Sequence, residues 1–253
     1  MGRMNLALLP ALALAAGSAI AAPPPGPGAQ AQPGSQAFQG SPVSPVSEDR
    51  IAEEVVAVIH FPNGPEQHVI TLTRLAEEAR IALVSRGAVG AAARPLDAAA
   101  LRAGLEWLVD QTVLMDEVTR LNILDVERKD VLQDLARFRS RFAKADEYQA
   151  FLERLDLSPE ELMAVLRRML RVQRYVESRV SGAARVRDAE VEAYFREHRS
   201  EFAGRDLGAV REAVRAHLAQ ERIKADVSTL LAELRGHCEL RILADLDRVG
   251  AGR

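Results

Sequence analysis

His237-Cys-Glu-Leu-Arg-Ile-Leu243 is the stretch of sequence that decides the fold. Its apolar residues alternate with Glu239 and Arg241, and this two-residue period is typical of a half-buried strand. A lone strand leaves its backbone groups without hydrogen-bond partners, so it needs a second strand beside it. We therefore predict that this segment pairs with the only other strand-forming region of the chain, which lies near the opposite end.

That region is a predicted hairpin. Val55–Phe61 is apolar and rich in β-branched residues, as strands are. Pro62-Asn-Gly-Pro65 indicates a turn, although its two prolines fit a tight two-residue hairpin poorly, and His68–Thr71 is the expected return strand. The resulting fold class is mainly α: a multi-helix domain with a small antiparallel sheet formed by the N-terminal hairpin and the C-terminal strand.

Between these strands the sequence predicts a series of helices. Ser158-Pro-Glu-Glu161 is the strongest local signal, because it combines a serine cap, a proline in the first turn and acids at the positive helix end. The predicted helices are Arg74–Arg86 after an N-cap at Thr73, a helix from Asp97 to Asn122, Val126–Phe142, a short helix capped by Asp146 with Gln149, a helix from Ser158 to Val180, Ala189–Arg199 with Asp188 in place of a cap, and Asp206–Arg235. Residues 88–95 are expected to form a loop.

The first residues are typical of an export signal. Arg3 precedes an apolar run over Leu6–Ala16, and Ala19-Ile20-Ala21 fits a small-x-small cleavage site. We predict a signal peptide over residues 1–21, a flexible leader rich in Pro, Gly and Ser over 22–49, and a short tail over 246–253. The predicted localisation is therefore periplasmic, with no stable membrane insertion.

Composition and motifs exclude several kinds of site. Hydrophobic residues make up 48% of the 253 residues and charged residues 27%, which is typical of a globular protein. The net charge of -3 gives little attraction for phosphate backbones and so argues against nucleic-acid binding. Cys238 is the only cysteine, and its pairing with His237 does not make a metal site because adjacent strand residues point to opposite faces. The sequence contains no phosphate-binding loop, dinucleotide fingerprint or nucleophile elbow, so no cofactor, metal or catalytic residue is predicted.

Five segments, in this order and spacing, resemble the chaperone module of the SurA/PrsA-type periplasmic folding factors. The first is Val55–Phe61 with Asn63-Gly64 and Ile70–Leu75, and the second is Leu105–Leu114 with Leu121–Ile123. The third is Phe151–Leu155 with Leu157–Leu162, running on through Leu170–Tyr175. The fourth is Val186-Arg-Asp-Ala-Glu-Val-Glu-Ala-Tyr-Phe-Arg-Glu-His-Arg-Ser-Glu-Phe202, and the last is Val210–Val214 with Leu231–Arg235 and the closing strand. In that family a parvulin prolyl-isomerase domain commonly lies between the last two segments. Here only Ala203, Gly204 and Arg205 separate Phe202 from Asp206. The resemblance therefore implies a single SurA-like domain over 50–245, with the junction at 203–206 and without the isomerase.

The resemblance implies an ATP-independent chaperone, a holdase, that binds unfolded or extended outer-envelope clients and is not an enzyme. Apolar and flexible side chains suit such a role, and the candidate client-binding residues are Phe142, Tyr148, Phe151, Met163 and Met169. Ordinary core packing is the alternative for each of them. The arginine clusters at 137–141 and 167–174 fit either a solvated polar face or a basic rim that attracts acidic clients. Alternative functions are a prolyl-isomerase-associated protein and an envelope scaffold with one fixed partner.

Overall fold

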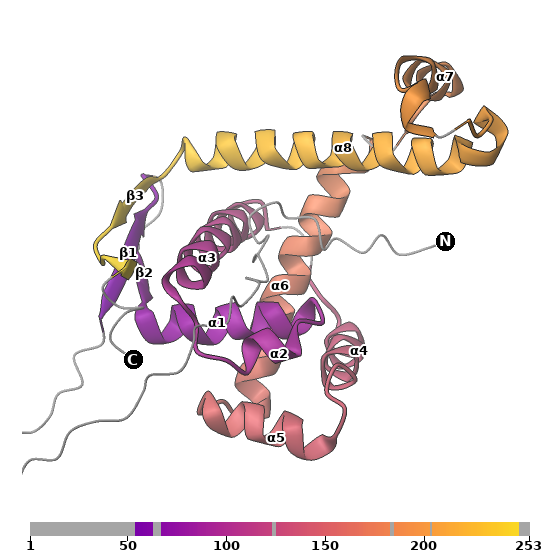
Figure 1. Cartoon of the computed structure of the whole chain (residues 1–253). Helices are drawn as coiled ribbons and strands as arrows, with labels where there is room; N and C mark the ends of the chain where they lie inside the picture. The colour runs from indigo at the N-terminus through magenta and orange to yellow at the C-terminus, as the bar shows by residue number, and fades with distance from the viewer. Residues whose placement is uncertain (1–53, 63–66, 123–124, 183–184, 203, 248–253) are drawn as a thin grey trace, which may run out of the picture. The chain divides into compact units, whose positions relative to one another are not determined.

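The two ends of the folded part meet in one antiparallel sheet with the strand order β2-β1-β3 (Figure 1). The computed structural model describes residues 54–62, 67–122, 125–182, 185–202 and 204–247. The predicted signal peptide, the whole predicted leader, most of the predicted turn and residues 248–253 lie outside the described residues. The elements are β1 (Val55–His60), β2 (Gln67–Thr71), α1 (Leu72–Ser85), α2 (Val89–Ala92), α3 (Ala98–Arg120), α4 (Arg128–Arg139), α5 (Ala145–Arg154), α6 (Pro159–Val180), α7 (Asp188–Glu197), the 3-10 turn η1 (Arg199–Phe202), α8 (Leu207–Arg235) and β3 (Glu239–Ile242).

The predicted long-range pairing is confirmed. β1 is the central strand, and Ile59 lies opposite Leu240 of β3 and His68 of β2. Ile59 is fully buried, and Leu240 packs against the same core cluster. Ile242 was expected to be half-buried but is 54% exposed, because it is the last residue of a short edge strand.

Three predicted N-caps are confirmed. The side chains of Asp97, Ser158 and Asp206 accept hydrogen bonds from the backbone N–H groups three residues further on, at 2.7, 3.2 and 2.8 Å. Glu161 accepts in return from the backbone N–H of Ser158 at 2.8 Å, which completes the predicted capping box of α6.

Other helix boundaries differ from the predictions. Thr71, not Thr73, caps α1, because β2 runs directly into the helix and the N–H of Leu72 bonds back to Glu54 O at 2.8 Å. Asp146 does not cap α5, which begins one residue earlier, so its carboxylate lies in the first turn. The predicted loop 88–95 contains the one-turn helix α2.

Helix α3 lies at the centre of the helical body. It packs against α1, α6 and α8, and its side chains Leu108 and Leu114 are 1% and 0% exposed. Gly104 allows the closest approach to α1, since a Cβ at that position would lie 3.0 Å from the Cβ of Ala79. Because three helices cover α3, its middle section is almost entirely buried, including the polar residues Asp110, Gln111 and Thr112.

Candidate functional site

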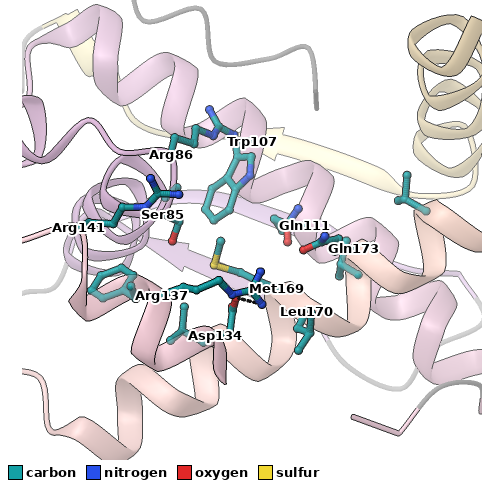
Figure 2. A pocket seen from close by; sticks show the side chains of 15 residues that line it. Ser85, Arg86, Trp107, Gln111, Asp134, Arg137, Arg141, Met169, Leu170 and Gln173 are labelled. Atoms are coloured by element: carbon teal, nitrogen blue, oxygen red, sulfur yellow. Dashed lines mark ion pairs between the residues drawn. The ribbon is translucent and has the colours of Figure 1, made fainter. Parts of the chain in front are cut away.

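A cavity of about 200 Å³ lies between α1, α3, α4 and α6 (Figure 2). Its apolar wall is formed by Trp107, Phe138, Leu166, Met169 and Leu170. Figure 2 shows the Met169 side chain directed toward the Trp107 ring. The volume is below the roughly 300–1,000 Å³ typical of sites for drug-sized ligands, so the cavity suits a compact group.

Three arginines surround this apolar wall: Arg86 from the end of α1, and Arg137 and Arg141 from the α4 region. Arg137 is paired with Asp134 at 2.9 Å. Arg86 and Arg141 have no carboxylate partner within the part of the chain that the structure describes. Burial lowers the pKa of Arg86 from its ordinary value, which reflects the cost of keeping a poorly solvated cation. The lining therefore carries two positive charges in excess of its single negative one.

Gln111 adds an unsatisfied polar group to the same cavity. It is only 3% exposed and lines the cavity from α3. Its amide makes no hydrogen bond to a residue that the structure describes, and its polar atoms are not among the fully buried, unsatisfied ones. Gln173, shown close to it in Figure 2, instead donates to Glu177 at 2.9 Å. The Gln111 amide is therefore available to a group that enters the cavity.

The three aromatic candidates from the sequence come together, but inside the core. Phe142, Tyr148 and Phe151 have ring centroids 5.5–5.7 Å apart and are 9%, 8% and 5% exposed. Phe138 joins them, and the Arg139 guanidinium lies over the Tyr148 ring at 5.1 Å. In this conformation the rings hold α4 and α5 together, so a client would reach them only after α5 moved. Their predicted role stays a prediction.

The two methionine candidates lie apart from each other. Met163 packs against the small cluster of Val126, Val131 and Leu170. Met169 lines the cavity described above and is partly buried against two core clusters. Met169 is thus the one client-binding candidate that lines the cavity, together with Arg137 and Arg141 from the predicted arginine cluster. Arg86, Trp107 and Gln111 were not predicted as site residues.

A second candidate surface was also missed: the segment that we call the arm, comprising residues 186–202 and 204–218. Figure 1 shows α7 beside the first half of α8, at the end away from the sheet. The arm has a separate apolar cluster in which only Val191, Val210 and Val214 are fully buried. The members that remain partly exposed are Val186, Tyr194, Phe195, Phe202, Leu207 and Leu218.

The aromatic rings of the arm contact one another. Phe195 stacks on Phe202 with centroids 5.1 Å apart. Tyr194 stacks on His198 at 4.0 Å and lies 5.4 Å from His217. The sequence signal was present, because aromatic residues are only 4% of the chain and three of them occur within Tyr194–Phe202.

Ion pairs join α7 to α8 around this small cluster. Asp188 pairs with Arg211 and Arg215, and Glu190 pairs with Arg222 at 2.7 Å. Glu190 also accepts from the backbone N–H of Arg187 at 2.8 Å, so it satisfies the start of α7, where Arg187 stands at the N-cap. These bonds lower the pKa of Glu190 to about 2, with the Arg222 hydrogen bond as the largest cause.

We predict that Glu190→Gln loosens α7 from α8. In this variant the backbone amide hydrogens of α7 should exchange several-fold faster than in the wild type at neutral pH. The reason is that the neutral glutamine side chain bonds Arg222 more weakly than the glutamate carboxylate does. Since the pKa of Glu190 is depressed in the folded state, its stabilising contribution is present at pH values above the ordinary pKa of 4.5. This contribution is lost as the pH falls toward about 2. Amide NMR shifts of α7 should follow that titration. Glu197→Gln, at an exposed position of the same helix, is the control and should leave both measurements unchanged.

Two further properties concern the described residues as a whole. Among them, no three histidine, cysteine, aspartate or glutamate side chains are grouped so that they could hold a metal ion. None of the helices described is both long and apolar enough to cross a membrane. Cys238 is half-buried just before β3, where burial raises the pKa of its thiol.

Comparison with protein-family models, with curated proteins and with solved structures returns no match for this chain.

Proposed function

We propose that this protein is an ATP-independent periplasmic chaperone, a holdase, that binds unfolded or extended outer-envelope polypeptides. The observation that supports this most is the arm, where aromatic and aliphatic side chains stay partly exposed in one cluster. Apolar side chains that stay partly exposed together are a feature of surfaces that bind other polypeptides. An unfolded polypeptide offers the apolar side chains that would cover it.

Charge and flexibility agree with that role. The arm carries arginines and acidic residues in nearly equal number, so charged segments of either sign in a client would find partners there. The ion pairs of Asp188 and Glu190 hold α7 with few fully buried contacts, which lets the arm adjust to clients of different sequence. The resemblance to the SurA/PrsA-type module and the predicted signal peptide support the proposed compartment and client class.

The test is suppression of aggregation. The purified protein should keep an unfolded outer-membrane protein from aggregating at a near-stoichiometric ratio without any nucleotide. Tyr194→Ser combined with Phe195→Ser should weaken that suppression, because it removes two rings from the arm. Leu132→Ser, at a leucine 45% exposed on α4, is the matched control and should suppress like the wild type.

Several results would contradict the proposal. Failure to suppress aggregation of several different clients would overturn it, provided that the variants and the wild type melt cooperatively. Capture of one dominant partner from an envelope extract, instead of many unfolded proteins, would favour the scaffold alternative. Acceleration of cis/trans exchange in a proline peptide would favour the isomerase alternative.

A further inference from the structure

The cavity between α1, α3, α4 and α6 combines an apolar wall with cations that lack a counter-charge. Trp107, Phe138 and Met169 supply the wall. Arg86 and Arg141 supply guanidinium groups with no carboxylate partner among the residues that the structure describes. Apolar side chains alone would suit any hydrophobic group, whereas the cations select for a negatively charged one.

The Gln111 amide and the Trp107 ring further restrict the class of ligand that would fit the cavity. Gln111 is 3% exposed, faces the cavity and has no hydrogen-bond partner in the described chain, so it offers both a donor and an acceptor. A polar ligand atom in the cavity could bond to this amide. Trp107 is 2% exposed and offers a flat apolar ring beside this amide. Arg86, Arg141 and the α3 pair Trp107 and Gln111 come from three different elements, and the packing of these elements fixes the spacing of the four groups.

We infer that this cavity binds a carboxylate carried on a compact apolar group, with the carboxylate at Arg86 and Arg141 and the apolar group against Trp107 and Met169. The cavity volume of about 200 Å³ limits the apolar part to roughly one large side chain. Such a ligand has two sources: a free small acid, or the C-terminal residue of a polypeptide. This inference does not require the chaperone role, because the cavity and the arm consist of different residues.

Burial of Arg86 gives a reason why the ligand would bind well. Because Arg86 is poorly solvated, its pKa is lowered from the ordinary value. A carboxylate would replace the missing solvation of this guanidinium with charge-assisted hydrogen bonds, which are stronger than bonds between neutral groups. Asp134 does not fill this role, because it is paired with Arg137 at 2.9 Å.

The experiment uses the fluorescence of Trp107, which is the single tryptophan of the chain. The probes are N-acetylphenylalanine and its amide, titrated into the full-length protein at neutral pH. The acid should change the emission saturably and bind about tenfold more tightly than the amide or better, since one charge-assisted contact is worth that much. An amide that binds as tightly as the acid, or an acid that causes no saturable change, would overturn the inference.

Variants locate the site. Arg86→Met should weaken binding of the acid about tenfold or more, while Arg128→Met, an exposed arginine of α4 outside the cavity, should leave it unchanged. If Arg86→Met lowers the melting temperature, Arg141→Met serves instead, since Arg141 is exposed and packs less. Binding by either cavity variant with wild-type affinity would contradict the inference.

A third pair of probes separates the sources. Phenylpropanoate has the carboxylate and ring but no peptide group, whereas Gly-Gly-Phe has all three. Tighter binding of the peptide assigns the site to a polypeptide C-terminus, because the Gln111 amide would bond to its backbone. Equal or tighter binding of phenylpropanoate assigns it to a free acid.

Discussion

Leu114→Ala is expected to lower the free energy of unfolding by about 2–5 kcal/mol, the range for a leucine deleted from a well-packed core. Leu114 is fully buried on α3, where it belongs to the cluster that joins this helix to α6 and α8. Three helices meet there, so the surrounding side chains have little freedom to fill the void that the shorter alanine side chain would leave. Urea unfolding followed by circular dichroism measures the change.

The same chemical change at Leu132 supplies the control. Leu132 is 45% exposed on α4, so Leu132→Ala should shift the free energy of unfolding by no more than about 0.5 kcal/mol. Equal effects at the two positions would mean that α3 is not enclosed by α6 and α8 in solution. A large effect at Leu114 with an unchanged urea dependence would locate the loss in native packing.

The sheet could be predicted because strand-forming segments are scarce in this chain. Alternation over Cys238–Ile242 indicates a strand, and Val55–His60 offered the one region able to pair with it. The exposure of Ile242 could not be predicted, because alternation identifies the buried face of a strand but not how far the neighbouring elements extend over it. The N-cap prediction succeeded at Ser158 and failed at Thr73, where a strand runs directly into the helix. It also failed at Asp146, because α5 begins at Ala145 and the carboxylate lies inside the first turn.

The cavity could not be predicted, because its lining is spread over the chain. Trp107 and Gln111 belong to the buried length of α3, and periodicity says only that such residues face inward. Whether Gln111 finds a partner depends on how α3 crosses α6, which is a tertiary property. The basic rim was foreseen as one alternative for the arginines at 137–141, but Arg86 lies far from them in sequence.

Arg235→Leu should be the most costly single change to a polar residue of the sheet-proximal half of α8. Asp110 on α3 is only 3% exposed and accepts from the Arg235 Nε–H at 2.8 Å. Removing the arginine leaves a buried carboxylate without its cation, which costs roughly 3–5 kcal/mol for a fully buried pair. Since the Arg235 side chain is itself 35% exposed, solvent reduces the cost of leaving Asp110 unpaired. We therefore expect the free energy of unfolding to fall by about 2–3 kcal/mol at neutral pH.

Two matched variants separate the buried pair from a general loss of charge. Arg241→Leu removes a cation whose partner Glu239 is 56% exposed, so its cost should stay below about 1 kcal/mol. Asp110→Asn added to Arg235→Leu should recover part of the stability, because the buried charge is then gone. A double variant no more stable than Arg235→Leu alone would contradict the assignment.

The pH dependence gives the sharpest test of this pair. Desolvation raises the pKa of Asp110, and Arg235 opposes that rise through its charge and hydrogen bond. Without Arg235 the folded-state pKa must rise further above that of the unfolded chain, so the folded protein binds the proton more tightly and gains stability at low pH. The deficit of Arg235→Leu relative to the wild type should therefore be small near about pH 4 and grow toward pH 7. A deficit independent of pH would mean that Asp110 finds another cation or water once Arg235 is removed.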